Sequence, residues 1–245
     1  MDAARSAEFQ AFLAAGPLQR GAIAARVSAA ARELPPGTRV LDAGAGNAPY
    51  RELFTHCDYR TQDWPASSHP GARHADIVAD LHELPVRTGR FDFVLCTEVL
   101  EHLPEPGQAL AEIRRILRPN GQLLITVPFV IELHEEPYDF FRYTPQALSR
   151  LLEQAGFAPP SIQPLTGWWS TLAHVLLHCG GATRPTEGAP AWATRAAAFA
   201  MRHLSALLAE AAPTLDRLDQ RHALPIGWVS TTRVPPQTGH GTSAS

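Results

Sequence analysis

The sequence predicts an α/β protein in which a mostly parallel sheet carries helices on both faces. Short apolar segments typical of buried strands alternate along the chain with segments of helical periodicity, and the first of these strands runs into a glycine turn, Gly44-Ala45-Gly46. Alternating strands and helices form a parallel sheet, because each helix returns the chain to the end of the sheet at which the strands begin. With 245 residues, 45% of them hydrophobic, the chain can form one domain with a sizeable core.

Two segments of good helix formers open the chain. Residues 3–15 and 18–34 are rich in Ala, Leu, Arg and Glu. Pro35-Pro36-Gly37 ends the second segment, since proline cannot continue a helix. We therefore expect residues 1–36 to form N-terminal helices that precede the sheet.

The sheet is expected to begin at residues 39–43, a short apolar run that ends at the glycine turn. Pro49 favours a first helical position, where its missing N–H would be unpaired anyway, so residues 49–54 predict the start of a helix. Further strands are expected at residues 59–62, 77–79, 91–96, 122–127, 161–165 and 226–234, and further helices at 109–117 and 145–155.

The last strand is preceded by an Ala- and Leu-rich segment, residues 168–218, which we interpret as an inserted helical cap. The main domain then spans residues 37–234. Residues 235–245 are mostly small and polar and predict a disordered tail.

Composition excludes several classes of protein. Lys and Arg number 21 against 24 Asp and Glu, so no basic field would attract nucleic-acid phosphates. Three widely spaced cysteines without metal-binding spacing indicate a reducing compartment. His174 and His178 interrupt the best candidate for a membrane span, and no secretory signal is visible. We therefore expect a cytoplasmic protein without stable membrane insertion.

The turn after the first strand is typical of a nucleotide site. Gly44 and Gly46 lack Cβ atoms and can adopt positive φ, which lets backbone N–H groups approach a ligand. Asp63 lies 21 residues beyond Asp42, close to the spacing of about 20 at which dinucleotide folds present a ribose-binding carboxylate. The alternative is a plain turn beside a solvated Asp63. A dinucleotide is disfavoured, because Pro49 stands where its third glycine is needed.

Asp80 and Leu81 follow the third predicted strand. A carboxylate there can accept the exocyclic amine of adenine, while an apolar side chain contacts the ring. The two residues therefore extend the candidate nucleotide site to the base.

Several motifs, in the expected order, resemble the class I S-adenosylmethionine-dependent methyltransferases. They are VLDAGAG at 40–46, Asp63, Ala79-Asp80-Leu81, FDFVLCTEVLEHL at 91–103 and ILRPNGQLL at 116–124. The likeness covers roughly residues 39–157, with weaker agreement to residue 234. It implies a Rossmann-like sheet of seven strands in the order 3-2-1-4-5-7-6, an antiparallel last strand, and S-adenosyl-L-methionine as cofactor.

The resemblance also implies roles for individual residues. Asp42, Gly44, Ala45 and Gly46 would hold the methionine end of the cofactor, Asp63 its ribose, Asp80 and Leu81 its adenine, and Cys96 and Thr97 the wall near the sulfur. Two departures are Asn47-Ala48 and Asn120-Gly121, which replace glycine-containing stretches common in the family. Neither removes a required group.

Methyl transfer mainly requires alignment and exclusion of water, and a base only for a weak nucleophile. Glu98 and His102 follow the fourth strand and His134 the fifth, where open α/β sheets bind ligands. We expect these loops to face each other across the substrate, with His102 or His134 taking a hydroxyl proton. The alternative for His102 is a purely structural role.

Glu98, Glu101, His102 and His134 could also bind one divalent ion. Some relatives with a Glu-x-x-Glu-His string use a metal, whereas many bind none. The favoured interpretation includes no resident metal.

An aromatic group near Arg142 is the candidate acceptor site. Tyr138, Phe141, Arg142 and Tyr143 could wall a planar or sugar-like molecule, although half of such a group could equally belong to the core. The cap could close over an apolar substrate or form a homodimer interface. A membrane role ranks lower, because its polar face is not rich in Lys or Arg.

The sequence therefore predicts a methyltransferase that acts on a small molecule, by preference on oxygen, in a biosynthetic pathway. One alternative is a lipid or quinone methyltransferase that uses the apolar cap. The other is a regulatory or assembly protein that binds the cofactor without turnover.

Overall fold

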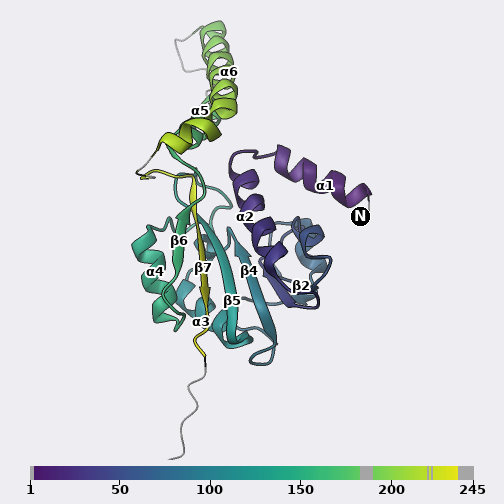
Figure 1. Ribbon diagram of the computed structural model, residues 1–245. Coiled ribbons are helices and arrows are strands. Elements are labelled where there is room, and N and C mark those ends of the chain that lie inside the picture. The colour runs from purple at the N-terminus through teal and green to yellow at the C-terminus, as the bar shows by residue number, and fades with distance from the viewer. Residues whose placement is uncertain (1–2, 183–189, 220, 222, 237–245) are drawn as a thin grey trace, which may run out of the picture.

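The computed structural model describes residues 3–182, 190–219, 221 and 223–236. Within that part of the chain, seven strands form one sheet in the order β3-β2-β1-β4-β5-β7-β6 (Figure 1). Strands β1 to β5 pair in parallel, and β7 runs antiparallel to both neighbours. The predicted fold class, strand order and antiparallel last strand are thus confirmed.

The strands are β1 (Arg39–Ala43), β2 (Asp58–Asp63), β3 (Ile77–Val78), β4 (Phe91–Thr97), β5 (Leu117–Pro128), β6 (Ser161–Pro164) and β7 (Gly227–Arg233). The α-helices are α1 (Ala3–Ala14), α2 (Gln19–Glu33), α3 (Pro106–Ile116), α4 (Pro145–Gln154), α5 (Trp168–Ala182) and α6 (Ala191–Leu215). Short 3₁₀ turns are η1 (Arg51–Phe54), η2 (Pro70–His74), η3 (Leu100–His102) and η4 (Asp216–Leu218).

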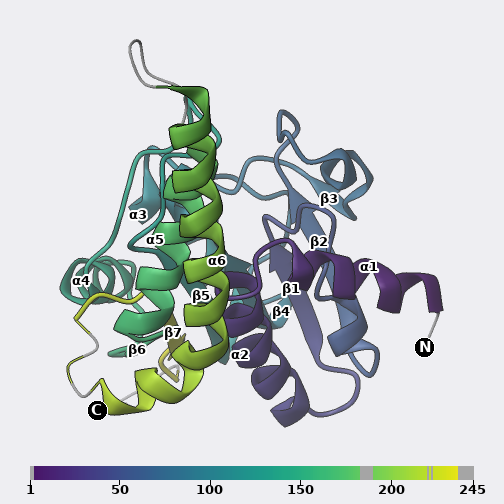
Figure 2. The same cartoon turned by 90° about the horizontal axis from the view of Figure 1, so that it is seen from above.

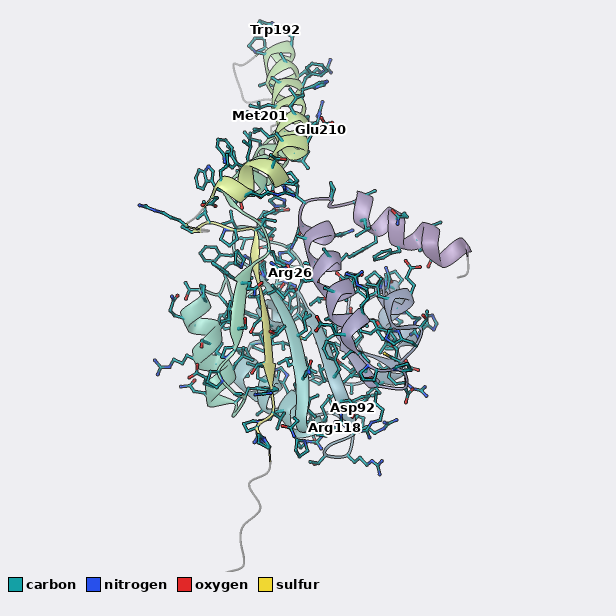
Figure 3. The ribbon with its side chains drawn as sticks, viewed as in Figure 1. Arg26, Asp92, Arg118, Trp192, Met201 and Glu210 are labelled. Atoms are coloured by element: carbon teal, nitrogen blue, oxygen red, sulfur yellow. The ribbon has the colours of Figure 1, made fainter. Side chains whose placement is uncertain are left out.

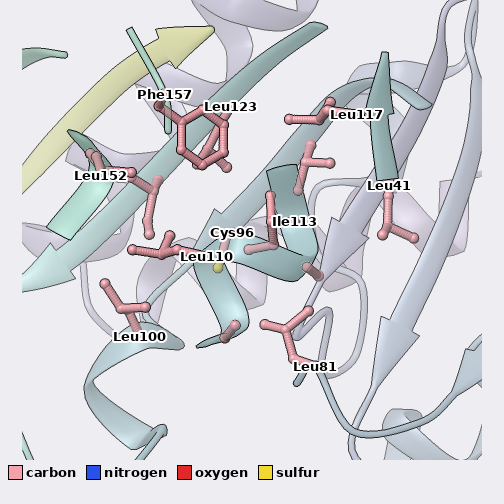
Figure 4. Packing of buried hydrophobic residues seen from close by; sticks show 14 of the residues in the cluster. Leu41, Leu81, Cys96, Leu100, Leu110, Ile113, Leu117, Leu123, Leu152 and Phe157 are labelled. Carbon is pink, nitrogen blue, oxygen red and sulfur yellow. The ribbon is translucent and has the colours of Figure 1, made fainter. Parts of the chain in front are cut away.

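Alternating side chains of the central strands enter two different cores. Leu41 of β1 and Val94 of β4 pack with the buried face of α3, as Figure 4 shows around Leu110 and Ile113. Their neighbours in sequence, such as Val40, pack on the other face against α2. Successive side chains of a strand point to opposite faces of the sheet, so each strand contributes to both cores. Because helices cover both faces, the strands are apolar at nearly every position.

The prediction that an α-helix starts at residues 49–54 was wrong. The structure has only the four-residue 3₁₀ turn η1 there. Strand β2 begins at Asp58 and leaves no room for a longer helix. Strand β5 also begins earlier than residue 122, at Leu117, and Asn120 within it adopts a positive φ of 62°.

Helices α5 and α6 lie side by side and project beyond the end of the sheet where the strands finish (Figures 1 and 2). Asp216 fixes the base of this cap, because its carboxylate accepts the Gly167 and Ser170 amides at 3.0 and 3.2 Å. Figure 3 shows Trp192 at the far tip of α6. Asp92 and Arg118 lie side by side at the opposite end of the sheet, where they form a 2.9 Å ion pair.

Among the described residues, no helix combines the length and the hydropathy that a bilayer crossing requires. The division into segments 1–36, 37–234 and 235–245 stays a prediction. Residues 237–245 of the expected tail lie outside the described part of the chain.

Candidate active site

A cavity of about 1230 Å³ lies where β1 and β4 end. Its walls come from the turn after β1, the loops after β4 and β5, the junction of α1 with α2, and the cap helices. Strand order reverses beside β1, which lies between β2 and β4. In open α/β sheets, ligands bind in the crevice outside the carboxyl ends of strands at such a point.

The glycine turn is shaped by close packing. Gly44 and Gly46 have φ values of 71° and 56°, a region that favours glycine. A Cβ on Gly44 would lie 2.3 Å from a methyl carbon of Val99, so no larger residue fits without movement. The turn therefore keeps a bare main-chain surface on the cavity.

The amides of Gly44, Ala45 and Gly46 have hydrogen-bond acceptors within the protein, and their role toward a ligand stays a prediction. Gly44 and Ala45 donate to the Gln62 carbonyl at 2.9 and 3.0 Å, and Gly46 donates to the Asp63 carboxylate at 2.6 Å. Buried backbone donors must be paired, and the adjacent strand β2 supplies the acceptors.

Asp42 is a buried carboxyl on the cavity wall, where the Tyr59 hydroxyl donates to it. Burial raises the pKa of Asp42 to about 7, although the Tyr59 hydrogen bond opposes this shift. Its charge is therefore sensitive to pH near neutrality and to any cation bound beside it.

The structure places only some of the predicted cofactor residues on the cavity wall. Asp42, Gly44, Ala45, Gly46 and Thr97 line it. Four others do not line the cavity, and the roles assigned to them stay predictions: Asp63, Asp80, Leu81 and Cys96.

Each of these four has other contacts. Asp63 is held by the amides of Gly46 and Trp64 at 2.6 and 2.7 Å. The Asp80 carboxylate lies 2.6 Å from the His82 ring. Leu81 and Cys96 are core residues, and burial raises the pKa of the Cys96 thiol.

The loops after β4 and β5 come together, but their two histidines contact each other instead of facing each other across a substrate-sized gap. The rings of His102 and His134 pack edge to face with centroids 4.9 Å apart, and both line the cavity. Nδ1 of His102 lies 2.7 Å from the Tyr138 carbonyl. A carbonyl can only accept, so this nitrogen carries the proton and Nε2 is the acceptor in the neutral ring. Burial lowers the pKa of His102, which favours that neutral form.

Glu101 lies behind the two histidines and is fully buried. Within the described part of the chain neither of its oxygens has a hydrogen-bond partner, and the nearest imidazole nitrogens, Nε2 of His102 and His134, are 3.6 and 4.0 Å away. Burial, reinforced by Glu98, raises the pKa of Glu101 well above its usual range. Glu101, His102 and His134 could together hold a metal ion, because one ligand atom from each lies within 4.8 Å of the others.

Glu98 lies outside that group, and each of its oxygens accepts a hydrogen bond from another side chain. Thr126 donates to one at 2.8 Å and the Gln19 amide to the other at 2.6 Å. Burial raises the pKa of Glu98, although these two hydrogen bonds oppose the shift. The contact with Gln19 brings the start of α2 into the site.

The loop that carries His134 is held by Arg142 and Asp139. Arg142 donates to both Asp139 oxygens at 2.6 and 2.8 Å and to the Glu132 carbonyl at 2.9 Å. This bond to Arg142 places the pKa of Asp139 far below its usual range. Asp139 in turn accepts the backbone N–H of His134 at 2.9 Å, so the pair fixes the position of that residue.

The four predicted acceptor-binding residues, Tyr138, Phe141, Arg142 and Tyr143, all lie outside the cavity lining. Tyr143 is buried in the core, and its hydroxyl donates to the Leu100 carbonyl at 3.1 Å. Phe141 packs against the same core. Tyr138 is 47% exposed and contacts Trp64 edge-on. Their substrate role stays a prediction to which this placement gives no support.

Sequence reasoning missed Gln19, Tyr59, Asp139 and the cap histidines as members of the site. Gln19 contacts Glu98 across 79 residues of chain. No local pattern marks such contacts, and only the doublet His174 and His178, one helical turn apart, carried a signal.

The chain is similar to known methyltransferases in sequence and in fold. Residues 17–161 match the family described as "Methyltransferase domain". A tRNA (carboxymethyluridine(34)-5-O)-methyltransferase of Arabidopsis thaliana is 31% identical over 57% of this chain and 35% of its own length. The ubiquinone biosynthesis O-methyltransferase of Psychrobacter arcticus is 25% identical over 51% of this chain and 61% of its own length.

Among solved structures, a SAM-dependent methyltransferase from Archaeoglobus fulgidus superposes with a TM-score of 0.55 at 15% identity. The superposition covers 86% of this chain and 92% of that one, and it supports the fold. The chain thus spans less than two thirds of the length of the curated relatives that it matches.

Proposed function

Because the chain belongs to the methyltransferase-domain family, whose cofactor is S-adenosylmethionine, we propose that it transfers a methyl group to a small-molecule acceptor. The observation that carries this proposal is the cavity at the switch point, which brings the glycine turn, Asp42 and the pair His102 and His134 onto one surface. Its volume of about 1230 Å³ exceeds the roughly 300–1,000 Å³ of ordinary ligand pockets, so it can admit a cofactor and an acceptor together.

The residues present fit this cofactor, which supplies an electrophilic methyl group on a positively charged sulfur. Gly44 has no side chain, and a Cβ at this position would collide with Val99, so the main chain of the turn itself forms the cavity surface. Asp42 provides a carboxylate for the ammonium group. Asp63 keeps free lone pairs after it accepts two amides and can bind ribose hydroxyls. Asp80 and Leu81 are assigned to the adenine.

An oxygen acceptor is favoured by the paired histidines. We assign His134 as the base that takes the acceptor's hydroxyl proton, with His102 packed against it. Glu98 shapes the same wall through its bonds with Thr126 and Gln19. Both curated relatives described above are named as O-methyltransferases, which supports the same choice.

Two other acceptors follow from the names of relatives. A quinone or lipid acceptor is favoured by the apolar side chains that α6 exposes, including Phe199 and Leu207 at 57% and 67%. A tRNA acceptor is disfavoured by the formal net charge of -3, since nucleic-acid binding depends on basic residues that neutralise phosphates.

The proposal is tested by incubating the protein with S-adenosylmethionine labelled on the methyl group. Separate reactions would contain small phenolic and hydroxy-acid acceptors, quinols in detergent, and unmodified tRNA. Label should enter a small molecule. Label in tRNA alone would contradict the small-molecule assignment, and cofactor binding without transfer to any class would support the non-catalytic alternative.

Cofactor affinity should increase as the pH rises from 5.5 to 7. The pKa of Asp42 is about 7, so its carboxyl is almost entirely neutral at the lower pH and about half ionised at the higher. The cofactor's α-amino group, with a pKa near 8, stays cationic throughout. The affinity for the cofactor should increase about tenfold, in proportion to the ionised fraction of Asp42.

Isothermal titration of S-adenosylhomocysteine at both pH values measures this effect. The Asp42→Asn variant keeps an oxygen for the Tyr59 hydroxyl but cannot ionise, so its affinity should change much less with pH. An equal pH dependence in the variant would show that another group is responsible.

Removal of the Asp63 carboxylate should weaken cofactor binding by on the order of 100-fold. The Asp63→Ala variant loses a ribose acceptor and leaves the Gly46 and Trp64 amides unpaired, each a cost of about 1–3 kcal/mol. The Asp58→Ala variant, at the half-buried start of the same strand, is the matched control.

A ribose contact can be separated from a purely structural role. A 2′-deoxy analogue of S-adenosylhomocysteine should bind the wild type weakly and lose little more in Asp63→Ala. If the parent compound binds Asp63→Ala with wild-type affinity, the ribose assignment is wrong.

A further inference from the structure

A second cluster of metal-ligating side chains lies on the cap side of the cavity. Glu132 comes from the loop after β5, and His174 and His178 lie one turn apart on α5. One ligand atom from each lies within 4.8 Å of the others. This cluster shares no residue with Glu101, His102 and His134.

The geometry at His178 suits a proton or a metal ion held between two acceptor atoms. Its Nδ1 lies 2.9 Å from the His174 carbonyl, which can only accept, so Nδ1 carries a proton. In the neutral ring Nε2 then presents a lone pair to the Glu132 carboxylate, only 2.9 Å away. Two acceptors at this distance repel unless a proton or a metal ion lies between them.

His174 adds a second, independent observation. Its side chain is only 10% exposed, and within the described residues its Nε2 has no hydrogen-bond partner; the nearer Glu132 oxygen is 3.5 Å away. The rings of His174 and His178 lie with centroids 4.1 Å apart. A buried ring nitrogen without a partner is costly, whereas a metal ion would satisfy it.

We propose that Glu132, His174 and His178 form a binding site for a divalent transition-metal ion, with Zn²⁺ as the best match. Two imidazole nitrogens and one carboxylate suit zinc, whereas magnesium and calcium prefer oxygen ligands. Three protein ligands leave one coordination position for water or a substrate group, and all three line the cavity.

The bound ion would link two parts of the molecule. It would join helix α5 of the cap to the loop of Glu132, two residues before His134. We therefore expect zinc to stabilise the folded protein, because an ion that binds only the native state raises the unfolding temperature.

The test uses the full chain without a polyhistidine tag, stripped with a chelator and titrated with ZnCl₂ by calorimetry. The wild type should bind zinc, and its unfolding temperature should rise on zinc addition. His178→Ala and Glu132→Gln should each bind at least about 100-fold more weakly, since even loss of an outer-shell partner costs 10–100-fold. Both side chains are substantially exposed, so neither change threatens the fold.

Two controls locate the ion. His203 lies on α6, and its Nδ1 approaches the Phe199 carbonyl at 2.9 Å, the same backbone contact as in His178; His203→Ala should bind zinc as the wild type does. His134→Ala should also retain this binding, which separates the site from the Glu101 cluster. Co²⁺ should give a ligand-field spectrum in the wild type that His178→Ala lacks.

The proposal is overturned if the wild type binds no zinc, or if His178→Ala and Glu132→Gln bind it with wild-type affinity and stoichiometry. Loss of zinc in His134→Ala alone would assign the ion to the other cluster. None of these measurements depends on methyl transfer, so they stand whether or not the proposed activity is found.

Discussion

Replacement of Gly44 by alanine should raise the dissociation constant of S-adenosylhomocysteine at least about 100-fold. Residue 44 has a φ of 71°, which costs an ordinary side chain roughly 1–2 kcal/mol. The new Cβ would also lie 2.3 Å from a methyl carbon of Val99, so the turn or the loop after β4 must shift. Either shift deforms the wall that we assign to the methionine end of the cofactor. Calorimetric titration measures the loss.

Two variants separate backbone strain from collision. Gly37 has a φ of 79°, and a Cβ there has nothing within 4 Å among the described atoms, so Gly37→Ala carries the strain alone and should bind the cofactor normally. Val99→Ala in the Gly44→Ala background removes the colliding methyl carbons and should restore part of the affinity. If Gly44→Ala binds S-adenosylhomocysteine with wild-type affinity, the turn is not part of the cofactor site.

The His134→Ala variant should turn over about 10²- to 10⁴-fold more slowly, the usual contribution of a general base, while its affinity for S-adenosylhomocysteine stays unchanged. Asp139 and Arg142 hold this histidine at the cavity from outside, so the substitution should leave the loop in place. Initial rates of labelled-methyl transfer at saturating substrate give the effect on kcat.

His102→Ala should slow turnover less, because we assign the base to His134 and propose that His102, whose Nδ1 is fixed by the Tyr138 carbonyl, positions it by ring contact. His203→Ala, on the outer surface of α6, serves as the neutral control. If His134→Ala and His102→Ala both retain the full rate, no histidine acts as base and the oxygen acceptor loses its main support.

The fold could be predicted because its signals are local. Val40 and Leu41 sit in one apolar run, and the structure buries them on opposite faces of the same strand. The helical spacing of Leu110 and Ile113 likewise marked the buried face of α3. The prediction of a helix at 49–54 failed because the start of β2 limits the length of this segment. The preference of proline for a first helical position carries no information about that limit.

The site could be predicted only in part. The loops carrying His102 and His134 were correctly expected on the same side of the sheet, since both follow neighbouring strands, but their rings touch where a substrate was expected between them. The contact between Gln19 and Glu98 and the approach of Glu132 to α5 depend on how distant segments pack. The use of the turn amides by Gln62 and Asp63 also escaped notice, because hydrogen-bond partners across strands are not visible in a local motif.

Calorimetric titration of the wild-type protein with S-adenosylhomocysteine tests the central claim most directly. The account predicts saturable binding of one molecule per chain, with the heat lost in Gly44→Ala and retained in Gly37→Ala. If neither S-adenosylhomocysteine nor S-adenosylmethionine binds the folded wild-type protein, the cavity beside Gly44 is not a cofactor site and the proposed methyl transfer is wrong.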